Sequence, residues 1–291
     1  MNMNCPICDS EKGMRIAIYG MPSFEPDEAE YFIAGCASEG QKKVCVICRW
    51  GIEDEGVPKI DISFDMRSDS YGKDPDRMSR TLKRYHKYLW NKQLPNGDFF
   101  YLESGKTNSY LHFNSYVSEM PLSSDSIGHS YKEVKKMRKV LENVASDDVE
   151  SFRTLNSTIG GFIIFPGRKV DGNMTINQER GTNSYIADRF DLTLECIRLH
   201  YEGDASPLSQ VLERYTEFFN LFHNFEGYVN FFLLNDLVDS EISRVNFFTE
   251  ISELFISSPL PRTKEEYLQY RGNSMSFIEN RNKRILEWVS G

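Results

Sequence analysis

The chain has 291 residues, of which 40% are hydrophobic and 13% aromatic, and its formal net charge is -9. These values are typical of a globular protein with a substantial core, and the acidic balance argues against nonspecific binding to duplex nucleic acid, which needs a basic face. No stretch approaches the roughly 20 apolar residues of a membrane-spanning helix, and the opening MNMNCPIC lacks the basic start and apolar run of a signal peptide. We therefore expect a cytoplasmic protein with reduced cysteines and no membrane contact.

Cysteines are concentrated near the N-terminus, where Cys5 and Cys8 form one Cys-x-x-Cys motif and Cys45 and Cys48 form another. Each motif presents two thiolates on one tight turn, so the two motifs together complete the tetrahedral S4 site that is usual for structural Zn²⁺. The competing interpretations are a redox pair, which normally stands alone at a helix N-terminus, and buried thiols without a metal. Cys36 is the extra cysteine, and we expect a small buried hydrophobe beside the site rather than a fifth ligand.

The segment between the two motifs carries strand candidates at 14–19 and 31–34. Its recognisable strings are Cys5-Pro6-Ile7-Cys8, Tyr19-Gly20-Met21-Pro22, Gly35-Cys36 and Cys45-Val46-Ile47-Cys48. With these strings the first 50 residues or so resemble small bacterial zinc-ribbon proteins. The resemblance implies bound zinc, but such ribbons serve DNA binding, protein docking and plain stabilisation alike.

Between about residues 59 and 180 the predicted elements are mainly strands. Alternation and apolar runs predict strands at 59–64, 98–102, 109–113, 159–165 and 174–176. A hairpin turn is predicted at Asn96-Gly97, a helix at 79–90 with Ser79 as its N-cap, and a loop at 121–130. A second helix is predicted at 131–144, and its lysine-rich outer face is either solvated or directed at an acidic or nucleic-acid partner.

From about residue 185 helical spacing predominates. Helices are predicted at 185–201, 206–222, 226–239 and from 264 to near the C-terminus. The first has two apolar flanks, should therefore be central, and ends at Gly203; the last starts from a capping box at Thr263-Lys264-Glu265-Glu266. We predict an α+β fold: a zinc ribbon at 1–55, then a domain at 56–291 with an antiparallel sheet and a helical C-terminal half from about 185.

Several strings of the larger domain form a specific pattern. They are Asp74-Pro75-Asp76, 85–90, Leu94-Pro95-Asn96-Gly97, 158–167, Asp171-Gly172, 175–178, Arg180-Gly181 and 186–198. This pattern resembles an uncharacterised bacterial family, a domain of unknown function, over residues 59–284 or so. The resemblance transfers no activity. Orphan families of this kind occur among bacterial defence and toxin genes, an association that suggests a toxin or anti-phage role as one alternative.

An acidic segment precedes the single histidine of the helix at 79–90. Asp65 and Asp74 lie in that segment and His86 lies on the helix, and an aspartate–histidine pair suits acid–base chemistry or metal binding. The alternative is a histidine that is simply packed or exposed. These three residues are the catalytic candidates of the sequence.

Arginines near the turns of the segment 158–202 form the candidate anion site. Side chains on turns after strands point into ligand crevices, and the planar guanidinium suits phosphate. The predicted ligand-binding residues are Arg168, Asn177, Arg180 and Arg189. The alternative is that Arg189 forms an ion pair inside the core with Asp188 or a carboxylate such as Glu195, which would fix the buried helix.

Two functions follow, and the sequence does not decide whether the protein is an enzyme. The first is a regulatory or interaction protein, with structural Zn²⁺ on Cys5, Cys8, Cys45 and Cys48 and the ribbon docking a protein partner. It rests on a strong metal motif and the absence of a recognised catalytic signature. The alternative is an enzyme acting on a nucleotide or nucleic acid, a toxin or anti-phage effector, with an arginine-lined site.

Overall fold

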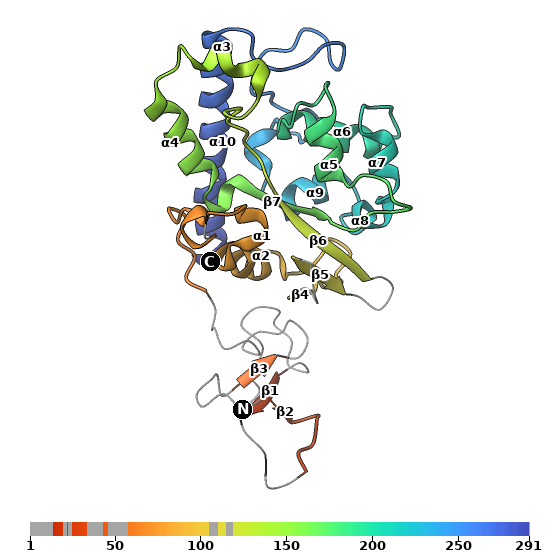
Figure 1. Ribbon diagram of the computed structural model, residues 1–291. Helices are drawn as coiled ribbons and strands as arrows, with labels where there is room; N and C mark the ends of the chain where they lie inside the picture. The colour runs from red at the N-terminus through yellow and green to blue at the C-terminus, as the bar shows by residue number, and fades with distance from the viewer. Residues whose placement is uncertain are drawn as a thin grey trace.

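The computed structural model describes residues 14–19, 22, 25–33, 43–45, 58–70, 72–104, 110–114 and 119–290 (Figure 1). These residues form two sheets that share no strand, together with a set of helices concentrated in the C-terminal half. The predicted mixed α+β fold with an antiparallel sheet and a helical C-terminal half is confirmed. None of the described helices combines the length and the apolar character needed to cross a lipid bilayer.

The N-terminal sheet has the order β2-β1-β3. Its strands are β1 (Met14–Ile18), β2 (Tyr31–Ile33) and β3 (Lys43–Cys45). β1 pairs with β2 in parallel and with β3 antiparallel, in a register that places Met14 opposite Cys45. The two strands predicted between the cysteine motifs are thus confirmed.

The larger sheet is antiparallel throughout, in the order β4-β5-β6-β7. Its strands are β4 (Leu102–Ser104), β5 (Leu111–Asn114), β6 (Glu119–Ser126) and β7 (Phe162–Pro166). Every residue of β7 is buried, as expected for an apolar run rich in β-branched and aromatic side chains. The strand predicted at 159–165 begins later, at Phe162, because a short 3₁₀ helix, η3 (Ile159–Gly161), occupies the first predicted residues.

Helices surround this sheet. Before β7 lie η1 (Met66–Asp69), α1 (Pro75–Met78), α2 (Arg80–Trp90), η2 (Lys135–Met137), α3 (Arg138–Leu141) and α4 (Ser146–Asn156). After β7 lie α5 (Ile176–Thr182), α6 (Phe190–Glu202), α7 (Ser209–Glu213), α8 (Thr216–Asn220), α9 (Phe225–Phe231), η4 (Asn235–Leu237) and α10 (Lys264–Ser290). In Figure 1 the long α10 runs past α3 and α4. The hydroxyl of Ser79 caps α2 as predicted, and Gly203 ends α6 in the left-handed conformation at φ 79°.

The helix α10 is anchored in the core by polar side chains. Arg281 is fully buried and donates to the carbonyl oxygens of Gly160, Phe162 and Phe232 at 2.6–3.2 Å. Its neighbour Asn282 accepts from the Gly160 N–H at 2.7 Å. These bonds satisfy backbone groups in η3, at the start of β7 and at the end of α9, which α10 would otherwise bury without partners.

Several predicted elements differ from the structure because local contacts redirect the chain. The predicted strand 59–64 is a turn, in which the Asp61 carboxylate accepts from the Ser63 N–H at 2.9 Å. The predicted strand 174–176 is the start of α5, where Thr175 and Gln178 form a capping box. The predicted loop 121–130 is largely β6, because β7 supplies a partner for its backbone groups.

The predicted helices 131–144, 206–222 and 226–239 are each broken into shorter pieces. The first begins only at η2, since Tyr131 has a left-handed backbone at φ 58°. In the third, α9 ends at Phe231 and Leu233 is left-handed at φ 56°. Both residues are buried, so tertiary packing rather than helix propensity decides these ends.

Candidate functional site

A pocket of about 220 Å³ lies between the start of α1, the segment after β6 and the end of α4. Its wall includes Asp74 and Asp76 from α1 and its cap, His129 after β6, and Arg153 from α4. Arg67 from η1 completes its rim. We call it the Asp76 pocket.

Asp76 owes its position to the first turn of α1. The Asp74 side chain caps the helix by accepting from the Asp76 N–H at 3.1 Å, and Pro75 occupies the first helical position. The Asp76 carboxylate accepts from the Ser124 hydroxyl of β6 at 3.2 Å. Burial raises the pKa of Asp76 well above its usual value, and the negative charges of Asp125 and Asp74 add to this.

A buried guanidinium connects two further carboxyl groups to this region. Arg180 of α5 is fully buried and forms an ion pair with Asp125 of β6, and its second ion pair reaches Asp188 at 3.6 Å. Its Nε donates to Thr193 of α6 at 3.2 Å. Burial raises the pKa of Asp125 to about 6, although Arg180 acts in the opposite direction.

The carboxyl groups around Arg180 outnumber its single positive charge. The carboxyl groups of Asp76, Asp125 and Asp188 influence one another and share one buried guanidinium, that of Arg180. Within the part of the chain that the structure describes, no three His, Cys, Asp or Glu side chains are placed to hold a metal ion. A proton on one carboxyl group reduces the excess of negative charge, in agreement with the raised pKa of all three.

His129 faces the same pocket as a neutral imidazole. Its Nδ1 accepts from the Tyr131 N–H at 2.9 Å, so Nε2 carries the hydrogen, and Nε2 lies 3.7 Å from the Asp188 carboxylate. Burial and the charge of Arg180 lower the pKa of His129 to about 4. Tyr131, Ala187 and Asp188 have left-handed backbones at φ 58°, 49° and 61°. Such strain in residues other than glycine is concentrated at functional sites in proteins.

His86, a catalytic candidate of the sequence, lies inside the core at one end of a polar chain. Its Nδ1 is 3.1 Å from the Tyr110 hydroxyl, Tyr110 interacts with Ser124, and Ser124 donates to Asp76. Burial and the positive charge of Arg281 lower the pKa of His86 to about 3, so the ring is neutral. His86 Nε2 has no hydrogen-bond partner among the described residues. The chain joins His86 to the Asp76 pocket without bringing the two side chains into contact.

The other two catalytic candidates, Asp65 and Asp74, cap short helices near the same pocket. Asp65 caps η1 and forms an ion pair with Arg67 at 2.6 Å, while Asp74 caps α1. Asp76, which follows Asp74 by two residues in the same acidic segment, is the carboxyl group that lines the pocket beside β6. Their catalytic role stays a prediction.

The structure does not bring the four predicted ligand-binding residues into one pocket. Arg168 is exposed after β7, Arg180 is in the ion-pair group described above, and Asn177 donates to Ser123 Oγ and the Ser124 carbonyl at 3.0 Å. Arg189 forms an ion pair with a carboxylate inside the core, as the alternative interpretation predicted, and that carboxylate is Asp191. Ligand binding by these residues stays a prediction.

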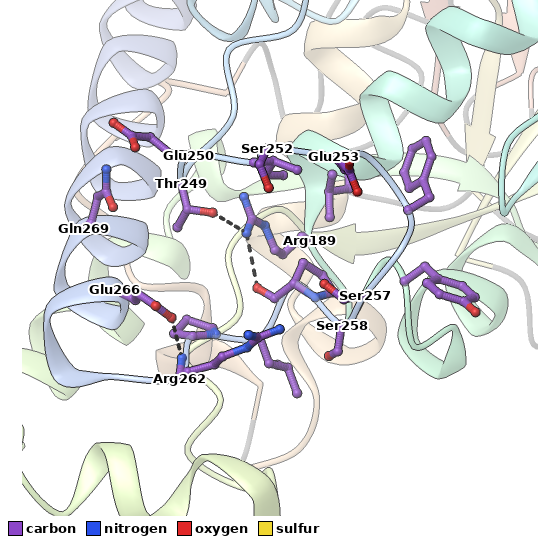
Figure 2. Close-up of a pocket in the computed structure, with 17 residues that line it drawn as sticks. Arg189, Thr249, Glu250, Ser252, Glu253, Ser257, Ser258, Arg262, Glu266 and Gln269 are labelled. Atoms are coloured by element: carbon purple, nitrogen blue, oxygen red, sulfur yellow. Dashed lines mark hydrogen bonds between the residues drawn. The ribbon is translucent and has the colours of Figure 1, made fainter.

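Arg189 also reaches a second pocket, of about 460 Å³, beside the first turns of α10 (Figure 2). Its guanidinium donates to Thr249 Oγ1 at 2.7 Å and to the Pro259 carbonyl at 3.3 Å. The charged residues that line this pocket are Glu250, Glu253, Glu266, Arg189 and Arg262. An anion entering it would therefore meet more carboxylates than guanidinium groups.

Of the predicted zinc ligands, Cys45 alone falls in the described residues, where it is buried at the end of β3. Cys5, Cys8 and Cys48 lie outside the described residues, as does Cys36. The zinc site stays a prediction.

Sequence reasoning missed Asp76, Asp125, His129 and Asp188 as site residues. Asp125 lies in the serine-rich segment expected to be a loop, and Asp76 lies in the acidic segment that supplied Asp65 and Asp74. Had a strand been predicted there instead of a loop, Asp125 would have been a candidate. No signal in the sequence places Asp76 beside Ser124, 48 residues away.

The sequence pattern of a family of unknown function (DUF6994) matches residues 60–285 of the chain. No curated protein and no solved structure matches the chain.

Proposed function

The chain belongs to the DUF6994 family of unknown function, and from the geometry of its own residues we propose that it is an enzyme in which Asp76 transfers a proton to or from a small polar substrate. The observation that carries this proposal is the half-buried Asp76 carboxyl group at the wall of a pocket, close to the half-buried carboxyl groups of Asp125 and Asp188. Strongly perturbed titratable groups in a pocket are frequent at catalytic sites.

The electrostatics favour Asp76 as a general acid. Its raised pKa means that it keeps its proton to a higher pH than an exposed aspartate, and Asp125 and Asp188 remain with Arg180. A protonated carboxyl group can then donate to a leaving oxygen or nitrogen atom of the substrate. The Ser124 hydroxyl fixes the orientation of the carboxyl group.

The pocket limits the substrate. A volume of about 220 Å³ is below the roughly 300–1,000 Å³ of sites that enclose a drug-sized ligand. It can take a small molecule or one reacting part of a larger one. Arg153 at the rim is 37% exposed and is held by Glu150 at 2.9 Å. It is the group that would meet the phosphate of a nucleotide, the substrate class expected for a toxin or defence effector.

The test is substrate consumption by three forms of the protein: wild type, Asp76→Asn and Asp204→Asn, the last an exposed aspartate beyond α6. Each is incubated with nucleotides and with a polar small-molecule extract, and the mixtures are compared by mass spectrometry. Wild type and Asp204→Asn should consume the same compound, and Asp76→Asn should do so about 100-fold more slowly. Equal turnover by Asp76→Asn, or no consumption by the wild type, would refute the proposal.

A second candidate is the regulatory or interaction role, with a zinc ribbon as the docking module for a protein partner. It is supported by the two Cys-x-x-Cys motifs, which precede the matched family region, and by the burial of Cys45 in a small sheet. Native and denaturing mass spectrometry should differ by one zinc mass, and an equal mass in both would contradict it. Cys45→Ala should abolish partner binding, whereas Arg168→Ala should leave it intact.

A further inference from the structure

A lysine outside the Asp76 pocket has an unusual environment of three aromatic rings. Lys92 follows α2, and its Nζ lies 4.9 Å from the ring centroid of Trp90, 4.7 Å from that of Phe231 and 4.9 Å from that of Trp288. These rings come from the ends of α2, α9 and α10. The backbone at Lys92 is held too, because its carbonyl accepts from the Phe100 N–H at 2.9 Å.

Within the described part of the chain, no carboxylate forms an ion pair with Lys92. The nearby cation is Arg281, whose guanidinium carbon lies 5.7 Å from the centroid of the same Trp90 ring. His223 and Glu226 line the neighbouring pocket, and neither forms an ion pair with Lys92. Burial and the charge of Arg281 lower the pKa of Lys92 to about 7. The three rings favour the ammonium form and so limit this fall.

The pocket beside Lys92 has a volume of about 450 Å³, within the roughly 300–1,000 Å³ typical of small-molecule sites. It lies between the turn that follows Lys92 and the start of α9. Leu94, Pro95 and Phe231 provide its apolar walls. Gln93, His223, Asn224, Glu226 and Asn230 line the rest of it. A pocket with one apolar wall and an amine beside that wall can hold a hydrophobic molecule and present an electrophilic carbon to the amine.

We propose that Lys92 is a nucleophilic amine that condenses with an apolar aldehyde or ketone held in this pocket. The lone pair of the unprotonated nitrogen attacks the carbonyl carbon, a C–N bond forms as the C–O π bond breaks, and one proton passes from nitrogen to oxygen to give a carbinolamine. Loss of water then leaves an imine, with no oxidation or reduction. The inference does not depend on proton transfer by Asp76.

The test uses hexanal as the probe and cyanoborohydride to reduce the imine to a stable secondary amine on the full-length protein. Peptide mapping by mass spectrometry compares Lys92 with the exposed Lys132 and Lys264. At pH 7 Lys92 should be modified at least about tenfold faster than either, because a larger share of its amine is unprotonated. A rate equal to or below that of the exposed lysines would overturn the proposal.

Four controls make the result specific. Lys92→Arg keeps a cation over the rings but cannot form an imine, so the fast adduct should disappear while the unfolding midpoint is unchanged. In urea the preference for Lys92 should be lost, and its persistence would refute a role for the fold.

Glyoxylate, a charged aldehyde, should react with Lys92 more slowly than hexanal. Equal rates would refute an apolar site. Asp76→Asn should leave the labelling of Lys92 unchanged.

Discussion

Asp76 links the pH of the solution to the stability of the fold. Its pKa in the folded protein is raised above its ordinary value of 3.8, so folding takes up a proton between the two values. Stability from this group is therefore fully present at low pH and is lost as the pH rises through the folded pKa. Asp76→Asn removes the cost of a buried charge.

We expect Asp76→Asn to be more stable than the wild type at pH 8, with the difference shrinking as the pH falls toward 4. Urea unfolding at a series of pH values measures this. Asp204→Asn, at an exposed aspartate, should follow the wild type throughout. A variant destabilised at pH 8 would show that the Asp76 carboxyl group is charged and well solvated.

Arg281 and Arg284 lie one helical turn apart on α10 but differ in their surroundings. Arg281 is fully buried and donates to carbonyl oxygens of three residues, whereas Arg284 is 37% exposed and pairs with Asp236 at 2.9 Å. Arg281→Met should cost about 3 kcal/mol of unfolding free energy or more, because buried carbonyl groups lose their donors. Arg284→Met should cost less than about 1 kcal/mol. Similar losses in urea unfolding would mean that the buried donors contribute little.

At the scale of elements, the junction between α4 and η3 depends on a close backbone approach. A Cβ at Gly161 would lie 2.0 Å from the Asn156 carbonyl oxygen, whereas a Cβ at Gly272, in α10, meets nothing within 4 Å. Gly161→Ala should therefore destabilise by about 2 kcal/mol or more. Gly272→Ala should stabilise by up to about 1 kcal/mol, because alanine has the higher helix propensity. Thermal unfolding of both variants tests this, and a neutral Gly161→Ala would mean that the junction can open.

At the scale of the whole molecule, the N-terminal segment lies outside the matched family region, which begins at residue 60. If zinc stabilises only that segment, a chelator should release one metal ion and leave the main unfolding transition unchanged. Hydrogen exchange resolved by peptides would show faster exchange in the peptide of β3 and unchanged exchange in β7. Loss of protection in β7 would instead show that the metal supports the larger domain.

Some features follow from the sequence because their causes are local. The Ser79 cap of α2, the stop of α6 at Gly203 and the Thr263 start of α10 depend on side chains and backbone within a few residues. The apolar run of β7 predicts a buried strand by composition alone. The sequence by itself thus determined the α+β class, the antiparallel sheet and the helical C-terminal half.

Other features were decided only by tertiary structure, since they depend on partners far along the chain. β6 is a strand because β7 pairs with it, although its serine-rich sequence indicates a loop. Arg180 and Asp125 are 55 residues apart in sequence, and the ion pair between them makes an arginine that was expected near a turn part of the core. The charge state of Asp76 likewise depends on which groups the fold brings near it. Local propensity carries no information about such contacts, because burial and charge pairing arise only when distant segments pack together.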